Sequence, residues 1–114
     1  MVKQAKPSDA MTLAGLAMKL WKAIGFAQCR LRHEYVEGTD SSPVGYLEGI
    51  FVEDAYRKHG HAKTLLRACE AWAKEKHCTE FASDCELEND DSLRFHTAMG
   101  FEVANRIICF RKDI

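Results

Sequence analysis

The feature that most constrains the fold is an apolar strand pattern, followed by a short polar turn and then an amphipathic helix pattern. Val44–Val52 is rich in β-branched and aromatic residues and predicts a strand. Ala62–Ala73 repeats apolar residues at the spacing of one helical face. Thr79–Asp84 predicts a second, short strand. Because crossovers of this kind are right-handed in nearly all proteins, the sequence predicts a βαβ unit whose two strands are parallel neighbours.

The N-terminal segments add further elements. Alternation across Ile24–Val36 predicts a strand that forms a hairpin with Val44–Val52 through a loop at residues 37–43. Val2–Ala5 is compatible with a short strand, and the turn at residues 7–9 can open a helix. That helix is predicted from one apolar face, formed by Leu13, Leu16, Ala17 and Leu20.

The C-terminal segments complete an α/β or α+β chain. Ser92–Met99 predicts a helix that Gly100 ends, and Phe101–Phe110 predicts a last strand or hairpin. A length of 114 residues fits one domain spanning residues 1–114.

Composition narrows the class of protein. A hydrophobic fraction of 46% and a charged fraction of 29% are typical of a globular domain, and the formal net charge of -1 gives no basic excess for nucleic acid. No apolar run is long enough to span a membrane, and the N-terminus lacks the apolar stretch of a signal peptide. An odd number of cysteines without a C-x-x-C pair argues against a disulfide framework or a zinc site, and favours a reducing cytoplasm. The five are Cys29, Cys69, Cys78, Cys85 and Cys109.

The turn between the predicted strand and helix is a candidate phosphate cradle. A helix N-terminus offers unpaired N–H groups and the positive end of a dipole, and the small residues Gly60 and Ala62 let the backbone approach an anion closely. The third glycine and the acidic residue of the dinucleotide fingerprint are missing. A basic solvated turn is the alternative interpretation. The cradle consists of Arg57, Lys58, His59, Gly60, His61 and Ala62.

This cradle resembles the acetyl-CoA motif of the GCN5-related N-acetyltransferases (GNAT), usually written Q/R-x-x-G-x-G/A. Residues 41–52 and Cys78–Asp84 are similar to the strands on either side of that motif in aminoglycoside 6'-N-acetyltransferases. Further similar positions bring the resemblance to about residues 24–112. They are Glu88-Asn89, His96, Gly100-Phe101 and Phe110-Arg111-Lys112.

The resemblance implies a GNAT acyl-CoA N-acyltransferase fold with a mixed central sheet and direct acetyl transfer from acetyl-CoA without a metal. In this family, backbone groups of the strand before the motif bind the pantetheine, which here implies Ile50, Phe51 and Val52. Asn89 resembles a pantetheine contact. His96 resembles a position near the thiol, although a packed core histidine is an equal alternative.

The prediction of the residues that bind the acceptor rests on charge. Aminoglycosides are polycations, so their pocket requires carboxylates, and the attacking amine must lose a proton. Glu48 lies in an otherwise apolar strand, and Asp84 lies at the carboxyl end of the next one, where open sheets bind ligands. Both match family positions that bind the aminoglycoside, and Asp84 is the first candidate for the general base. Trp21 resembles a tryptophan near the acceptor. A solvated strand residue and a turn or helix cap are the alternatives for Glu48 and Asp84.

The chain departs from the family between Trp21 and Ile24, where a helix and a strand are missing. Asn105 also replaces an acid of close relatives. A shortened N-terminal region predicts an unpaired sheet edge and hence a homodimer or larger homo-oligomer. The alternatives are acetylation of a polyamine or a peptide, or an acetyl-CoA-binding module without an acceptor site. Candidates for exposure are Ile24, Phe26, Cys29, Leu31 and Tyr35, with Ile107, Ile108 and Phe110 available for strand exchange.

Overall fold

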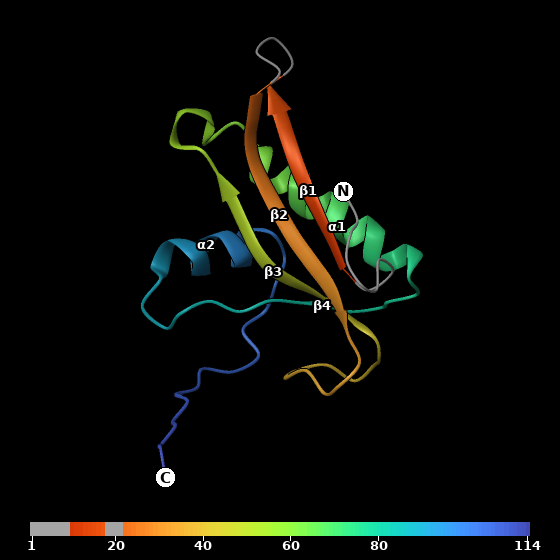
Figure 1. Cartoon of the computed structure of the whole chain (residues 1–114), viewed down its shortest axis with the longest axis vertical. Helices are drawn as coiled ribbons and strands as arrows, with labels where there is room; N and C mark the ends of the chain where they lie inside the picture. Colours follow the sequence, from red (N-terminus) through yellow and green to blue (C-terminus); the bar gives the residue numbers. More distant parts are fainter. Residues whose placement is uncertain (1–9, 18–21) are drawn as a thin grey trace. The chain divides into compact units, whose positions relative to one another are not determined.

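The computed structural model describes residues 10–17 and 22–114 and contains a four-stranded sheet in the order β1-β2-β3-β4 (Figure 1). The strands are β1 (Ala10–Ala17), β2 (Lys22–Arg32), β3 (Val44–Val52) and β4 (Phe81–Ala82). β2 pairs antiparallel with both β1 and β3, whereas β3 and β4 are parallel. The hairpin and the parallel βαβ pair predicted from the sequence are therefore confirmed.

Two helices follow the hairpin. A short 3-10 turn, η2 (Asp54–Tyr56), precedes α1 (His61–Glu75), which connects β3 to β4. The second helix, α2 (Asp90–Ala98), comes after β4. The chain divides into two compact units, Met1–Asp84 with the sheet and α1, and Cys85–Ile114 with α2. A single domain spanning residues 1–114 remains a prediction.

Helix α1 covers one face of the sheet and forms the main core. Its buried side chains are Leu65, Leu66, Cys69, Trp72 and Ala73, as helical spacing predicts. Alternate β2 residues, Ala27, Cys29 and Leu31, are buried as well. The hydrogen bond between the Cys29 and Cys69 thiols, followed by burial, raises the pKa of Cys29. The face of the sheet away from α1 is called the far face below.

Gly45 permits the close approach of β3, β4 and α1. A Cβ atom at this position would lie 2.5 Å from Phe81 Cδ1 and 2.8 Å from the Ala73 Cβ. The Gly45 amide donates to the Glu80 carbonyl at 3.1 Å. The β3–β4 register consists of Gly45↔Phe81 and Tyr46↔Ala82, after which β4 ends while β3 continues to Val52. The two parallel strands thus pair at one end and separate at the other.

The predicted helix with its face at Leu13, Leu16, Ala17 and Leu20 is wrong over the described residues. Ala10–Ala17 forms β1, which pairs with β2 along its length and shifts register between Gly15 and Leu16. Pairing supplies hydrogen-bond partners to β2, and such tertiary contacts override a weak helical preference. The expectations for Val2–Ala5, the turn at residues 7–9 and Trp21 lie outside the described residues.

The predicted exposure of the β2 edge is also wrong in part. Ile24, Cys29 and Leu31 are only 2%, 2% and 6% exposed, because α1 covers their side of the sheet and β1 occupies the edge. Phe26 and Tyr35 are exposed as expected.

The predicted strand at Phe101–Phe110 does not form. Residues 101–114 carry no strand or helix assignment. A strand requires a ladder partner for its N–H and C=O groups, and residues 101–114 form no ladder with any part of the chain that the structure describes. This segment instead exposes large apolar side chains, among them Val103, Ile107, Ile108 and Phe110.

Among the described residues, no helix combines the length and apolar character needed to cross a membrane.

Candidate functional site

A β-bulge in β3 places Glu48. The register passes from Gln28↔Gly49 to Cys29↔Leu47, so Glu48 is the extra residue on β3. Bulges often occur beside active sites, where they redirect a side chain. Glu48 is exposed within a strand whose preceding residues, Val44–Leu47, are all buried. The bulge thus presents an exposed carboxylate next to a buried stretch of β3.

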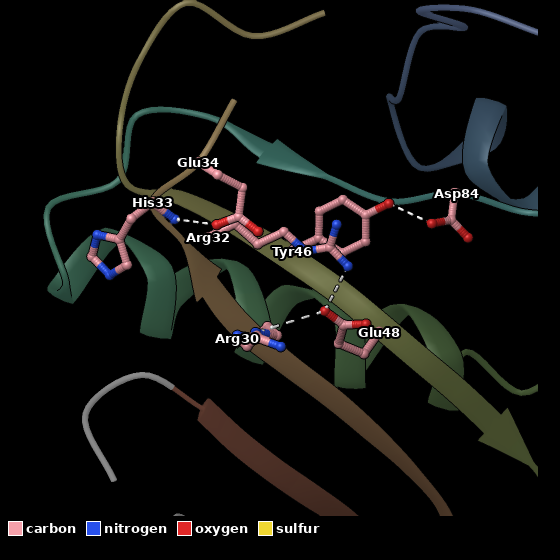
Figure 2. Close-up of polar contacts among 7 residues, drawn as sticks. All are labelled: Arg30, Arg32, His33, Glu34, Tyr46, Glu48 and Asp84. Carbon is pink, nitrogen blue, oxygen red and sulfur yellow. Dashed lines mark hydrogen bonds and ion pairs between the residues drawn. The ribbon is translucent and has the colours of Figure 1, made fainter. Parts of the chain in front are cut away.

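Two arginines of β2 approach this carboxylate on the far face (Figure 2). Arg32 Nη2 donates to Glu48 Oε2 at 3.0 Å, and Arg30 Nε lies 4.0 Å from the same oxygen. Arg30 and Arg32 share this face because side chains alternate along a strand. Partial burial lowers the pKa of Arg32, but the hydrogen bond to Glu48 and its charge outweigh this effect and raise the pKa overall.

Tyr46 links the arginine cluster to Asp84. The guanidinium carbon of Arg32 lies 3.5 Å from the centroid of the Tyr46 ring, a cation–π contact. The Tyr46 hydroxyl donates a short hydrogen bond to Asp84 Oδ2, as Figure 2 shows. Burial, the hydrogen bond to Asp84 and the charge of Asp84 raise the pKa of Tyr46 to about 12. The hydroxyl therefore stays protonated at neutral pH and remains the donor to the carboxylate.

One continuous set of contacts thus links the two predicted acceptor residues, Glu48 and Asp84. It runs from Glu48 through Arg32 and Tyr46 to Asp84. Asp84 follows the carboxyl end of β4, beside the point where β3 and β4 stop pairing. The sequence predicts both carboxylates as acceptor residues but does not single out Arg30, Arg32 or Tyr46. The available signal was alternation, because Arg30 and Arg32 are two residues apart on a predicted strand.

The separation of β3 from β4 leaves part of the β3 edge without a strand partner over the described residues. Ile50, Phe51 and Val52 lie on this stretch, beyond the last β3–β4 pair at Tyr46↔Ala82. Their backbone groups on that side can hydrogen-bond an extended ligand, as a strand would.

The cradle lies at the N-terminus of α1, between β3 and this helix. Gly60 is the N-cap of α1 with φ of 81°, and a Cβ there would meet no heavy atom within 4 Å. Lys58 also has a positive φ, of 65°. The first turn of α1 carries no acidic residue, and its N-cap makes no side-chain hydrogen bond. The N–H groups of that turn have no acceptor inside the helix and suit an anion.

Arg57 is turned toward the protein. Its Nε donates to the Val52 carbonyl at 2.8 Å, and its Nη1 lies 2.9 Å from Asp54 Oδ1. Arg57 therefore braces the turn between β3 and α1. The rings of His59 and His61 have centroids 6.1 Å apart, and His61 also lies edge-on to Tyr56.

Asn89 and His96 belong to the second compact unit. Asn89 caps α2, because its Oδ1 accepts from the Ser92 amide at 3.0 Å. His96 Nδ1 lies 2.7 Å from the Ser92 carbonyl oxygen, which requires a proton on that nitrogen. The His96 ring also lies 5.1 Å from the Phe101 ring, centroid to centroid. Both residues thus have structural contacts within their own unit.

The fold agrees with a comparison of the sequence with protein families. Residues 7–101 match the acetyltransferase (GNAT) family. The mixed sheet and its parallel βαβ unit, whose crossover helix α1 is capped by Gly60, agree with this class, and the chain belongs to it.

Known relatives narrow the class. Aminoglycoside N(6')-acetyltransferase type 1 of Salmonella typhimurium is 50% identical over 97 residues, which are 85% of this chain and 67% of that protein. The enzyme of the same name from Stenotrophomonas maltophilia is 35% identical over 142 residues, covering 99% of this chain and 93% of the relative. Within the GNAT proteins, the chain therefore belongs to the aminoglycoside 6'-N-acetyltransferase family. Because the second alignment is longer than the 114 residues of this chain, it contains gaps in this chain.

Solved structures support the fold. The structure of AAC(6')-Iy in complex with the bisubstrate analogue CoA-S-monomethyl-acetylneamine has a TM-score of 0.87 and 44% identity, covering 93% of this chain and 71% of that one. The apo structure of AAC(6')-IG from Acinetobacter haemolyticus has a TM-score of 0.86 and 42% identity, covering 93% and 72%. The predicted family and GNAT fold are confirmed.

Proposed function

We propose that the chain transfers an acetyl group from acetyl-CoA directly to the 6'-amino group of an aminoglycoside, in a ternary complex. The observation that carries this proposal is the placement of Glu48 and Asp84 on one set of contacts beside the separating ends of β3 and β4. Relatives named aminoglycoside N(6')-acetyltransferase supply the acceptor class. Such an enzyme confers antibiotic resistance by removing one positive charge from the drug.

Backbone groups of the site are suited to binding the cosubstrate, acetyl-CoA. Backbone groups of Ile50, Phe51 and Val52 that do not pair with β2 would bind the pantetheine arm along the unpaired stretch of β3, while the Val52 carbonyl already accepts from Arg57. A fixed N–H there can polarise the thioester carbonyl, where negative charge develops during attack. The cradle from Lys58 to Ala62 would hold the pyrophosphate, with Arg57 bracing it. Asn89 and His96 are assigned to acetyl-CoA by resemblance alone.

The acceptor residues have separate tasks. Asp84 accepts the proton of the attacking ammonium, directly or through water, so that a neutral amine attacks the thioester carbon. This first proton passes to the carboxylate. The new N–C bond forms, the C–S bond breaks, and coenzyme A leaves as the thiolate, which takes the second proton released by the nitrogen. Glu48 binds a second ammonium group of the acceptor. Trp21, outside the described residues, is assigned to the acceptor by resemblance alone. Binding both reactants together removes much of the entropic barrier.

The test is thiol release from acetyl-CoA in the presence of different amines. Neomycin and paromomycin form a matched pair, because they differ by an amine against a hydroxyl at the 6' position. Release with neomycin and none with paromomycin supports the proposal. Release with spermine or a peptide alone would assign a different amine. Binding of coenzyme A without release with any acceptor would indicate a binding module that lacks an acceptor site.

We also propose that the chain forms a homodimer or larger homo-oligomer. The segment from residue 101 to residue 114 exposes Ile107, Ile108 and Phe110 at 58%, 71% and 92%. Exposed apolar chain without a strand partner is a template for pairing with another copy. The five cysteines are all free, which suits a reducing cytoplasm as the compartment.

A further inference from the structure

We propose that Arg32 is a built-in cation that occupies the acceptor carboxylate of Glu48 in the free protein and is displaced by an ammonium group of the acceptor. The inference rests on the proposed function, because it takes Glu48 and Asp84 as the groups that bind the acceptor. It assigns to Arg32 a role in selecting acceptors by their number of positive charges.

The contacts of Arg32 are those that a bound ammonium group would make. Its guanidinium donates to Glu48 Oε2 at 3.0 Å, the oxygen that would otherwise accept from an ammonium. The same guanidinium lies 3.5 Å from the Tyr46 ring centroid, and that ring carries the hydroxyl bound to Asp84 (Figure 2). One cation is therefore placed directly against Glu48 and over the ring of Tyr46, whose hydroxyl binds Asp84.

The charged groups around Glu48 determine how an approaching acceptor can bind to it. Arg32 pairs with Glu48 at 3.0 Å, and Arg30 approaches the same oxygen at 4.0 Å. Glu34 is a further carboxylate that acts on both arginines. An ammonium group of the acceptor therefore reaches Glu48 only in competition with Arg32. When the Arg32 guanidinium leaves, Glu48 keeps only the longer contact with Arg30.

Arg32 can leave at small cost. Its side chain is 29% exposed and that of Glu48 is 33% exposed, so water reaches the ion pair. Ion pairs in such surroundings contribute little net stability, and the long arginine side chain can turn into solvent. An acceptor with one ammonium group merely exchanges one cation for another. An acceptor with several brings additional favourable contacts, so Arg32 favours polycations over simple amines.

The test measures the dissociation constant of kanamycin by calorimetry for the full chain and its variants. Arg32→Gln removes the cation at similar size, and should lower the dissociation constant by about fivefold at low salt, the factor expected for one partly exposed ion pair. High salt should reduce this difference. Arg67→Gln is the matched control: it removes the same charge from an ion pair with Glu70 on α1, and should leave kanamycin binding unchanged. Arg30→Gln, at 4.0 Å from Glu48, should have a smaller effect than Arg32→Gln.

The outcomes separate this inference from the proposed function. An unchanged or higher dissociation constant for a folded Arg32→Gln protein overturns the displacement of Arg32, even if the wild type acetylates neomycin. A higher value would show that Arg32 instead orients Glu48 for the acceptor. If the wild type shows no binding, a gain of binding in Arg32→Gln supports the inference, and its absence overturns it. Failure of acetyl transfer with every aminoglycoside, alongside tighter binding by Arg32→Gln, refutes the proposed function alone.

Discussion

Tyr46 donates its hydroxyl to the Asp84 carboxylate, and this hydrogen bond joins β3 to the residue just beyond the end of β4. The two residues lie beside the point where the parallel strands separate. Tyr46 also packs with Val36 and Val44 in a buried cluster, with Ala82 against it. A carboxylate held by a buried tyrosine has a defined position, which a general base requires.

The first prediction concerns ionisation of Tyr46. Its pKa of about 12 lies above the ordinary value near 10, so folding favours the protonated hydroxyl. This stabilisation is fully present below about pH 10 and is lost as the pH rises through about 12. An ultraviolet titration should show one late-ionising tyrosine among the three. Tyr46→Phe should remove that phase, and Asp84→Asn should move it to lower pH, because part of the shift arises from Asp84. An unaltered titration in Tyr46→Phe would contradict the assignment.

The second prediction concerns the general base. Asp84→Asn keeps the size of the side chain but cannot take the proton of the amine, so kcat should fall by about 10²-fold or more. The Michaelis constant for acetyl-CoA should change little. Asp91→Asn is the control, since Asp91 is an exposed carboxylate in the first turn of α2 that pairs with Arg94. Full turnover by Asp84→Asn at every pH would leave Asp84 with a purely structural role.

The third prediction concerns acceptor binding by Glu48. Glu48→Gln removes the charge while keeping the shape, so the Michaelis constant for an aminoglycoside should rise about fivefold at low salt. The variant and the wild type should converge at high salt, because screening weakens the interaction that is lost. This effect is opposite in sign to that expected for Arg32→Gln. Equal Michaelis constants at low salt would place Glu48 outside the acceptor site.

The sequence predicted those structural features whose determinants lie close together along the chain. Strand patterning and the turn residues of the loop at 37–43 predicted β2 and β3, and helical spacing predicted α1. Gly60 was proposed as part of the cradle because a small residue permits close approach to an anion, and the structure shows in addition that it is the left-handed N-cap of α1. These features depend on neighbouring residues along the chain.

Long-range determinants were missed. The leucine and alanine spacing of Ala10–Ala17 favours a helix, but pairing with β2 decides in favour of a strand. The contact of Arg32 with Glu48 depends on a register shift between two strands, which strand alternation alone does not reveal. The hydrogen bond from Tyr46 to Asp84 depends on the crossover that brings β4 beside β3. Glu48 and Asp84 themselves were found through family resemblance, supported by their charge in apolar surroundings.

The fourth prediction concerns the cradle. Gly60→Asp places a β-carbon on a backbone with φ of 81° and a negative charge beside the first turn of α1, so coenzyme A affinity should fall by at least about tenfold. Gly38→Asp is matched in backbone strain, with φ of 83°, but lies in the loop between β2 and β3. It should lower the melting temperature without altering coenzyme A binding. Calorimetry that gives wild-type affinity for folded Gly60→Asp would remove the cradle assignment.

The last prediction concerns assembly and uses two exposed cysteines. Cys109 lies in the C-terminal segment between Ile108 and Phe110, and Cys85 lies outside that segment; both are exposed and free. If the C-terminal segments of two copies pair, alkylation of Cys109 should slow as protein concentration rises, because pairing covers the thiol. Cys85 should react at a constant rate and serves as the internal reference. Ile108→Asp, which places a charge in the proposed contact, should restore fast alkylation of Cys109 at high concentration. Mass spectrometry after brief labelling separates the two sites. Concentration-independent labelling of Cys109, with a sedimentation mass near 12.9 kDa at micromolar protein, would show that the folded chain is a monomer.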